Sequence, residues 1–250
     1  MSVIKATASD TGEPSGESVT RRKHPGLLFL RDVLVIFVVA VLVSFLIKTF
    51  LIRSFFIPSE SMADTLEIDD RIIVNELVPD VVPIERGDVV VFKDPGGWLT
   101  ARPEEPQPPL VAAADWFLAF VGLTAPDSND HLVKRVIGLP RDHVTCCNAL
   151  GQLSINGVPL EEPYITLPPG DSKASRDDFD TTVPEDSLWV MGDNRYNSQD
   201  SRYQTDTPRE GFVPIENVVG RAFVVSWPIE NWAWLDNYPA VFDGVDGGGD

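Results

Sequence analysis

An apolar run from Val33 to Ile47 limits how this chain can fold more than any other stretch. Its 15 residues carry no charge, and extending it to Ile52 gives 20 residues. As a helix, that length is about 30 Å, the thickness of a bilayer's hydrocarbon core. Lys48 lies near the end of the span, where its ammonium group can reach the interface. Because the run has no polar face, it is not typical of a helix buried in a globular core. We predict one transmembrane helix over residues 32–52.

The residues that flank the run indicate an uncleaved anchor. A cleaved signal peptide is the alternative, but no small-x-small site follows the run, and the chain continues with Arg53 and two bulky phenylalanines. Basic residues are more frequent before the run than after it: Arg21, Arg22, Lys23 and Arg31 precede Lys48 and Arg53. The positive-inside rule then places residues 1–31 in the cytoplasm, as a disordered tail, and the remainder outside the cell membrane.

The charge of the chain argues against one class of partner. The formal net charge is −18. Residues 54–250 hold 13 basic and 34 acidic residues, a net charge of −21. Such an acidic domain repels phosphate backbones, so we expect no nucleic-acid binding. The expected partners are a lipid bilayer, through the anchor, and whatever the outer domain acts on; the oligomeric state is not predicted.

Short β-branched runs between loops rich in proline and glycine predict a mainly β, antiparallel domain over residues 53–227. The expected strands lie in residues 71–74, 88–92, 132–137, 144–160, 188–191 and 218–227, with hairpin signals at Gly151 and Asn156-Gly157. Residues 94–111 and 168–186 are expected to be loops. Residues 116–123 are expected to form a short helix or an interfacial segment within an insertion over 94–130. In the aromatic and acidic tail, 228–250, Trp232, Trp234 and Tyr238 either reach the membrane interface or pack on the domain.

Two adjacent cysteines, Cys146 and Cys147, are the only ones in the chain. Across a trans peptide their Cα atoms are about 3.8 Å apart, below the roughly 4.4 Å that a disulfide usually needs. We therefore expect no ordinary structural disulfide. His143 precedes Cys146 by three residues, but the chain has only two other histidines, His24 and His131. We predict no metal and no cofactor.

Two serines separated by one residue follow the anchor in the segment from Ile57 to Met62. Pro58 favours an extended backbone, which would point the hydroxyls of Ser59 and Ser61 to the same side. A nucleophilic hydroxyl beside a second donor is suited to acyl transfer. The alternative is a serine-containing linker between the membrane helix and the domain.

A nucleophilic serine needs a base, and neither His131 nor His143 has the sequence context of a triad. The candidate lysines after the anchor are Lys93, Lys134 and Lys173. In an extended strand, Lys134 shares a face with Leu132 and Val136, whereas Arg135 points the other way. Burial there would lower the pKa of the lysine and make it a base. The alternative is a strand lysine whose amine reaches solvent.

Four segments, in this order, resemble the signature boxes of the type I signal peptidases, which are membrane-bound Ser-Lys proteases. They are residues 58–66, 86–92, 134–140 and 191–202, so the resemblance covers about 32–227. Asp64 stands where the family more often has a proline. The resemblance implies a serine endopeptidase, anchored by one helix, that cleaves signal peptides from exported preproteins without a cofactor.

The resemblance also implies roles for individual residues. Ser61 is the expected nucleophile and Lys134 the general base, while the Ser59 hydroxyl and the Ser61 backbone N–H form the oxyanion hole. Ser198 is expected to orient the lysine amine. The expected structural support comes from Asp193, Asn194, Arg195 and the pair Asp200 and Arg202. Apolar Ile57, Met62 and Val133 are candidates for shallow pockets that select small-x-small sites.

Two other functions remain open from the sequence. One is a Ser-Lys protease with a self-cleaving or regulatory substrate. The other is a non-catalytic β domain anchored in the membrane.

Overall fold

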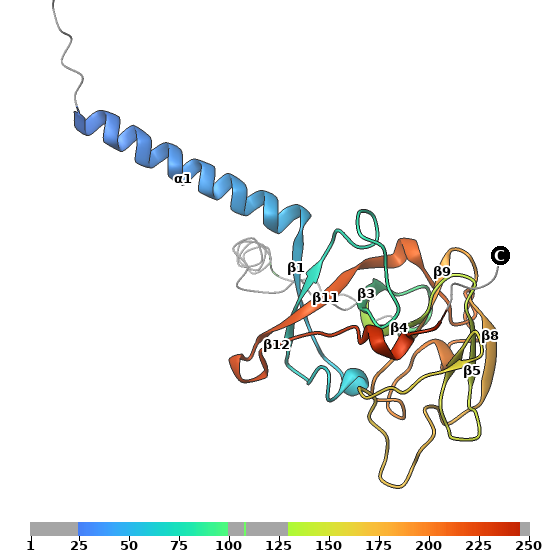
Figure 1. The fold of residues 1–250 in the computed structure, drawn as a ribbon. Helices are drawn as coiled ribbons and strands as arrows, with labels where there is room; N and C mark the ends of the chain where they lie inside the picture. Colours follow the sequence, from blue (N-terminus) through green and yellow to red (C-terminus); the bar gives the residue numbers. More distant parts are fainter. Residues whose placement is uncertain (1–24, 100–107, 109–129, 246–250) are drawn as a thin grey trace, which may run out of the picture. The chain divides into compact units, whose positions relative to one another are not determined.

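The computed structural model describes residues 25–99, 108 and 130–245. Helix α1 (Pro25–Phe50) is followed by strands that form two sheets (Figure 1). The helix begins earlier than the predicted residue 32, with a proline at its first position, where the missing N–H costs nothing. It ends before the predicted residue 52, because Ile52–Phe56 pairs with the next strand instead.

The chain divides into two units, Met1–Ser44 and Phe45–Asp250. The described side chains of α1, from Phe29 to Phe45, are exposed. Within the described residues, no helix has both the length and the apolar character needed to cross a membrane.

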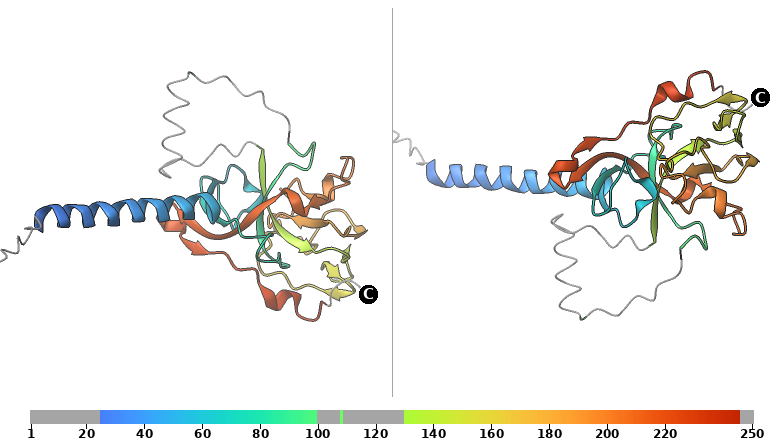
Figure 2. Two further views of the ribbon diagram at one scale, coloured as in Figure 1. Left: turned by 90° about the horizontal axis from the view of Figure 1, so that it is seen from above. Right: turned by 90° about the horizontal axis from the view of Figure 1, so that it is seen from below.

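The larger sheet has the strand order β1-β2-β11-β3-β4-β9-β10, and β12 pairs with β11. Its strands are β1 (Ile52–Phe56), β2 (Arg71–Asn75), β3 (Val89–Lys93), β4 (His131–Gly138), β9 (Ser187–Met191), β10 (Val213–Pro214), β11 (Val218–Trp227) and β12 (Ala233–Trp234). The smaller sheet has the order β7-β6-β5-β8, and Figure 2 shows both sheets from two further sides. Its strands are β5 (His143–Cys146), β6 (Ser154–Ile155), β7 (Val158–Pro159) and β8 (Phe179–Thr182). Short 3₁₀ helices lie between them: η1 (Glu60–Met62), η2 (Ser201–Tyr203), η3 (Ile215–Asn217), η4 (Ile229–Asn231) and η5 (Pro239–Phe242).

The pairings between these strands are antiparallel, so the predicted mainly β, antiparallel fold is confirmed. The predicted Asn156-Gly157 turn joins β6 to β7, and both residues have positive φ, 52° and 82°. Strand β8 lies inside the expected loop 168–186. The segment 116–123 and most of the expected insertion lie outside the described residues.

Three apolar clusters fill the β-rich part. One packs the smaller sheet against β4, β9 and η5, and contains Ile137, Leu153, Met191 and Phe242. A second joins residues of β1, η1, β2, β3 and β11, and a third joins residues of β3, β4, β9, β10 and β11. Strands β3 and β9 are buried almost throughout, so their branched and aromatic residues form the centre of the sheet.

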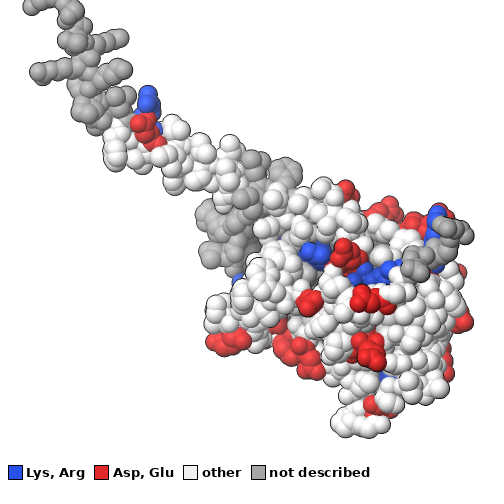
Figure 3. All heavy atoms as spheres, viewed as in Figure 1, with Lys and Arg blue, Asp and Glu red and all other residues white. Residues whose placement is uncertain are grey.

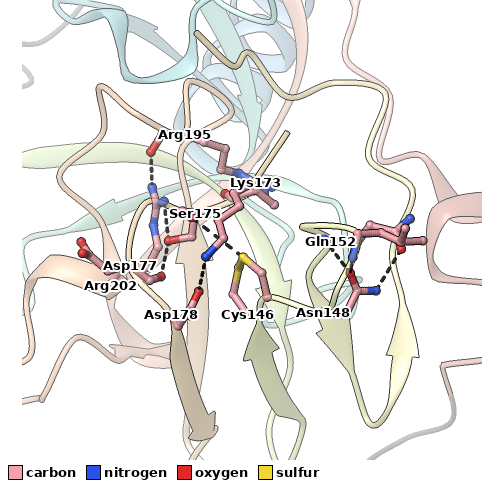
Figure 4. Close-up of a disulfide and its surroundings, with 12 residues drawn as sticks. Cys146, Asn148, Gln152, Lys173, Ser175, Asp177, Asp178, Arg195 and Arg202 are labelled. Carbon is pink, nitrogen blue, oxygen red and sulfur yellow. Dashed lines mark hydrogen bonds and ion pairs between the residues drawn. A yellow bond between two sulfur atoms is a disulfide. The ribbon is translucent and has the colours of Figure 1, made fainter. Parts of the chain in front are cut away.

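The sequence predicts no ordinary structural disulfide, but the two adjacent cysteines do form a disulfide with each other. Cys146 and Cys147 are joined across a cis peptide bond, with Cα atoms 3.0 Å apart. The prediction assumed the trans spacing. The sulfur of Cys147 lies 3.9 Å from the carbonyl oxygen of Ser175, and Figure 4 shows these surroundings.

Candidate active site

Residues 57–70, which connect β1 to β2, form the loop that carries both serines; this loop is called the nucleophile turn. Its base is closed by hydrogen bonds from the Ile57 N–H to the Asp70 carbonyl and from the Asp69 N–H to the Ile57 carbonyl. Ser59 is extended, with φ −139° and ψ 157°, but Ser61 lies in η1. The predicted extended backbone therefore holds only for Ser59. The two hydroxyl oxygens still lie 3.3 Å apart, because the 3₁₀ turn brings Ser61 back toward Ser59.

Contacts from the loop after β9 hold η1 in place. The Asn194 N–H donates to the Ser61 carbonyl at 3.2 Å, and the Asn194 side-chain amide donates to the Glu60 carbonyl at 3.1 Å. Met62 is only 1% exposed, and its sulfur accepts from the Asp193 N–H at 3.5 Å. The nucleophile candidate thus sits on a turn that is fixed at its backbone, while the Ser61 side chain stays partly exposed.

Lys134 reaches this turn from β4, which lies between β3 and β9. The lysine is 4% exposed. Its Nζ donates a hydrogen bond of 2.7 Å to Oγ of Ser61 and one of 2.9 Å to the carbonyl oxygen of Val133. The structure therefore brings together Ser59, Ser61 and Lys134 through direct polar contacts.

Burial lowers the pKa of Lys134 from 10.5 to about 8. The negative charges of Asp200 and Asp193 oppose the shift, and the positive charge of Arg202 adds to it. An amine with this pKa is neutral in roughly one molecule in ten at pH 7, against fewer than one in a thousand at the ordinary lysine pKa, and it lies within hydrogen-bond reach of a hydroxyl. Those are the two requirements for a general base.

Three buried ion pairs support the loops around the dyad. Arg135 pairs with Asp193, Arg202 with Asp200, and Arg195 with Glu162; the side chains of all six are at most 2% exposed. Asp200 also accepts from the Gly192 N–H at 2.9 Å, and Arg202 donates to the Arg195 carbonyl at 2.8 Å. Each charge is therefore paired, and the side chains of Asp200 and Arg202 also bind backbone groups of the loop after β9.

Ser198 does not make the expected contact with the lysine. Its hydroxyl is buried and has no hydrogen-bond partner within the described part of the chain. A Cβ on Gly192 would collide with this hydroxyl and with the Ser61 carbonyl oxygen. The absence of a side chain at Gly192 therefore lets Ser198 and the nucleophile turn pack against the same backbone, close to the dyad. The lysine-orienting role of Ser198 stays a prediction.

Two polar residues that support the site, Thr65 and Arg135, were not among the predicted site residues. Thr65 donates from Oγ1 to Asp193 at 2.6 Å, which ties the nucleophile turn to the loop after β9. Arg135 holds the same aspartate from the other side. Its position beside Lys134 in a buried strand was an available signal, since a buried arginine needs an acidic partner. Thr65 gave no comparable signal.

The candidate pocket residues lie near the turn. Ile57 and Met62 belong to the apolar cluster that includes residues of β1 and η1, and Val133 packs against it. On the face shown in Figure 3, acidic side chains are more numerous than basic ones, in line with the negative charge of the sequence.

Comparison with known proteins gives one consistent result. Residues 30–227 match the family model described as signal peptidase, peptidase S26. A probable signal peptidase I of Mycobacterium leprae is 36% identical, over 92% of this chain and 86% of the relative. The signal peptidase I of Leptolyngbya laminosa is 37% identical, over 74% of this chain and 73% of the relative. A crystal structure of a signal peptidase I from Enterococcus faecalis is 26% identical and covers 55% of this chain and 95% of its own, with a TM-score of 0.35.

Proposed function

The chain belongs to the signal peptidase family, peptidase S26, and on that premise we propose that it is a serine endopeptidase that removes signal peptides from exported preproteins. The observation that carries this proposal is the 2.7 Å hydrogen bond between Lys134 and Ser61. A buried amine of lowered pKa beside a serine hydroxyl is the Ser-Lys form of an activated nucleophile.

The reaction follows from the positions of these groups. Lys134 accepts the proton of Ser61 as Oγ attacks the carbonyl carbon of the scissile peptide bond. The bond to the leaving amine breaks, and Lys134 returns its proton to that amine. A water molecule, deprotonated by Lys134, then attacks the acyl-enzyme ester; on its collapse Ser61 regains a proton from the lysine and the signal peptide is released.

The tetrahedral intermediates carry a negative oxygen that needs donors. We assign the hydroxyl of Ser59 to this role, because it lies 3.3 Å from Oγ of Ser61 and is exposed to an incoming substrate. The backbone N–H of Ser61 is the second donor in this proposal. The carbonyl of Val133 fixes the lysine amine, and we propose that the buried hydroxyl of Ser198 orients this amine.

The substrate class rests on family membership and on the apolar residues beside the turn. A signal peptide would lie extended next to the segment that leads into Ser61, so that alternate side chains face the enzyme. Shallow pockets near Ile57, Met62 and Val133 would accept alanine, glycine or serine, since larger side chains would overfill them. We therefore propose cleavage after small-x-small sites.

We further propose that α1 anchors the protein in the cell membrane, with the N-terminal segment up to residue 31 in the cytoplasm and the β-rich part outside. The support is the uncharged run from Val33 to Ile47 and the larger number of basic residues before it. Protease added to spheroplasts should then digest residues beyond about 54 and spare the N-terminal segment. Protection of the β-rich part would contradict this orientation.

The central test is cleavage of a defined substrate. The full chain, purified in detergent, is incubated with a preprotein whose signal peptide ends in Ala-x-Ala, and the new N-terminus is sequenced. We expect one cut directly after the second alanine, none with Ser61→Ala, and poor cutting when that alanine is replaced by leucine. Binding without turnover would favour the non-catalytic alternative, and cutting only within the chain itself would favour a self-cleaving protease.

A further inference from the structure

The segment 228–245, called the strap below, follows the residues that match the family model and folds back onto β4. It begins with η4 and β12, which pairs with β11. The Leu235 N–H then donates to the Phe223 carbonyl at 3.0 Å. In Figure 1 the strap is the red part of the chain that runs past the label of β4. Of the three aromatic residues in the strap that were expected either at the membrane interface or on the domain, Tyr238 packs on the domain, against Tyr164. Trp232 and Trp234 are 51% and 66% exposed.

The strap meets the arginine that follows the lysine of the dyad. Arg135 is fully buried. Its guanidinium donates to both carboxylate oxygens of Asp193, to the Gly87 carbonyl at 2.7 Å and to the Asp236 carbonyl of the strap at 2.9 Å. The strap therefore supplies one of the acceptors that a buried guanidinium requires.

Two neighbouring aromatic rings complete this contact. The guanidinium carbon of Arg135 lies 4.1 Å from the ring centre of Tyr164 and 5.3 Å from that of Tyr238, and the two rings are 5.0 Å apart. Tyr164 belongs to the body of the domain, and Tyr238 belongs to the strap. The guanidinium thus loses an acceptor and one of its two ring contacts if the strap moves away.

From Arg135 the contacts lead directly to the nucleophile turn. Asp193, held by Arg135, accepts from Thr65 at 2.6 Å and donates from its N–H to the sulfur of Met62. The next residue, Asn194, donates to the Ser61 carbonyl. The orientation of the Arg135 guanidinium is therefore coupled to the backbone position of Ser61 through one aspartate.

We propose that the strap is a positioning element for the active site: it fixes Arg135, which fixes Asp193 and thereby the distance between Ser61 and Lys134. This inference rests on the proposed Ser61–Lys134 dyad. Tyr238 and the Asp236 carbonyl are the positioning groups, and they act through Arg135 without touching a reacting atom.

Both ends of the strap are attached, as a positioning element requires. Phe242 and Val245 are buried in the cluster between the sheets, and the Val245 carbonyl accepts from Arg86 at 3.5 Å. At Gly87 the backbone of the strap approaches so closely that an added Cβ would overlap the Asn237 carbonyl oxygen. Gly87→Ala would therefore push against the strap without changing its sequence, although the left-handed φ of 86° also strains residue 87 itself, so Tyr238→Ala is the more specific of the two variants.

The test compares four variants of the full chain in detergent: Tyr238→Ala, Tyr238→Phe, Gly87→Ala and the control Trp232→Ala. Trp232 is an aromatic residue of the same segment, and its ring contact is with Trp234. Initial rates of preprotein cleavage give kcat and KM, at a temperature where circular dichroism shows each variant folded. We expect kcat to fall about 10- to 100-fold for Tyr238→Ala and Gly87→Ala, with KM within about twofold, since small displacements of reacting groups cost rates of this order. Tyr238→Phe, which keeps the ring, and Trp232→Ala should retain wild-type kcat.

Three outcomes overturn the proposal. One is wild-type kcat for folded Tyr238→Ala and Gly87→Ala. Another is a lower melting temperature as the only effect, which would assign the strap a structural role. The third is a loss confined to KM, which would assign it to substrate binding. A failure of the wild-type chain to cleave, or full activity of Ser61→Ala, would instead contradict the proposed function itself, so the two failures are distinguishable.

Discussion

The amine of Lys134 donates a 2.7 Å hydrogen bond to the hydroxyl of Ser61, although 73 residues separate the two in the sequence. Strand β4 holds one residue and the 3₁₀ turn after β1 holds the other. Burial lowers the pKa of the amine to about 8, so the contact joins a nucleophile to a base that is available near neutral pH.

Removing either partner should abolish cleavage. Ser61→Ala and Lys134→Met each remove one half of the nucleophile activation, and we expect rates to fall about 10⁴-fold or more. Lys93→Met, at an exposed position on the neighbouring β3, is the matched control and should cleave like the wild type. Activity near the wild-type level in Ser61→Ala or Lys134→Met would show that the dyad is wrongly assigned.

Ser59 should contribute to the chemical step rather than to binding. We expect Ser59→Ala to lower kcat about 10²- to 10³-fold and to leave KM nearly unchanged, as the loss of one oxyanion donor does in other serine proteases. Ser54→Ala on β1 serves as the control. A change confined to KM would place Ser59 in a ground-state contact.

The rate should rise with pH through about 8. Lys134 must be neutral to accept the proton, so kcat/KM of the free enzyme should follow the fraction of neutral amine. A profile measured between pH 6 and 10 should therefore show an ascending limb centred near the lowered pKa of Lys134. A limb near the ordinary lysine value would mean that the amine is not buried in the active form.

Burial of the charged Lys134 amine should lower the free energy of unfolding at low pH. In the unfolded chain Lys134 keeps its proton up to about 10.5, but in the folded chain only up to about 8. The unfolded state therefore binds more protons between these values, and the lysine's contribution to the free energy of unfolding rises with pH in that window. We expect Lys134→Met to be more stable than the wild type at pH 7, by at most about 3 kcal/mol. The difference, measured by urea unfolding, should shrink between pH 8 and 10. A constant difference would contradict the shifted pKa.

The buried ion pair of Arg202 and Asp200 should matter far more for folding than an exposed pair. Asp200→Asn leaves a buried guanidinium without its charge partner, and we expect a loss of about 3 to 5 kcal/mol. Glu185→Gln is the control, because Glu185 pairs with Arg141 at the surface and should cost less than about 1 kcal/mol. Equal losses in urea unfolding would show that solvent reaches Asp200.

Strand periodicity made part of the site predictable. The branched residues around Lys134 indicated a buried strand, and the lysine does lie in β4 at 4% exposure. The serine pair was also visible, but the backbone that joins the hydroxyls was predicted wrongly. Its bend into a 3₁₀ turn depends on hydrogen bonds from Asn194, more than 130 residues away. The sequence likewise does not reveal that the peptide bond between Cys146 and Cys147 is cis.

The sequence by itself determined the residue types, the mainly β pattern and the excess of negative charge, because these depend on local periodicity and composition. The tertiary structure decided which groups meet: the carbonyl of Val133 against the amine of Lys134, Thr65 against Asp193, and the Asp236 carbonyl against Arg135. Such contacts are set by strand order and loop closure over long separations. A backbone carbonyl is present at every residue, so no pattern of side chains marks the one that the fold will use.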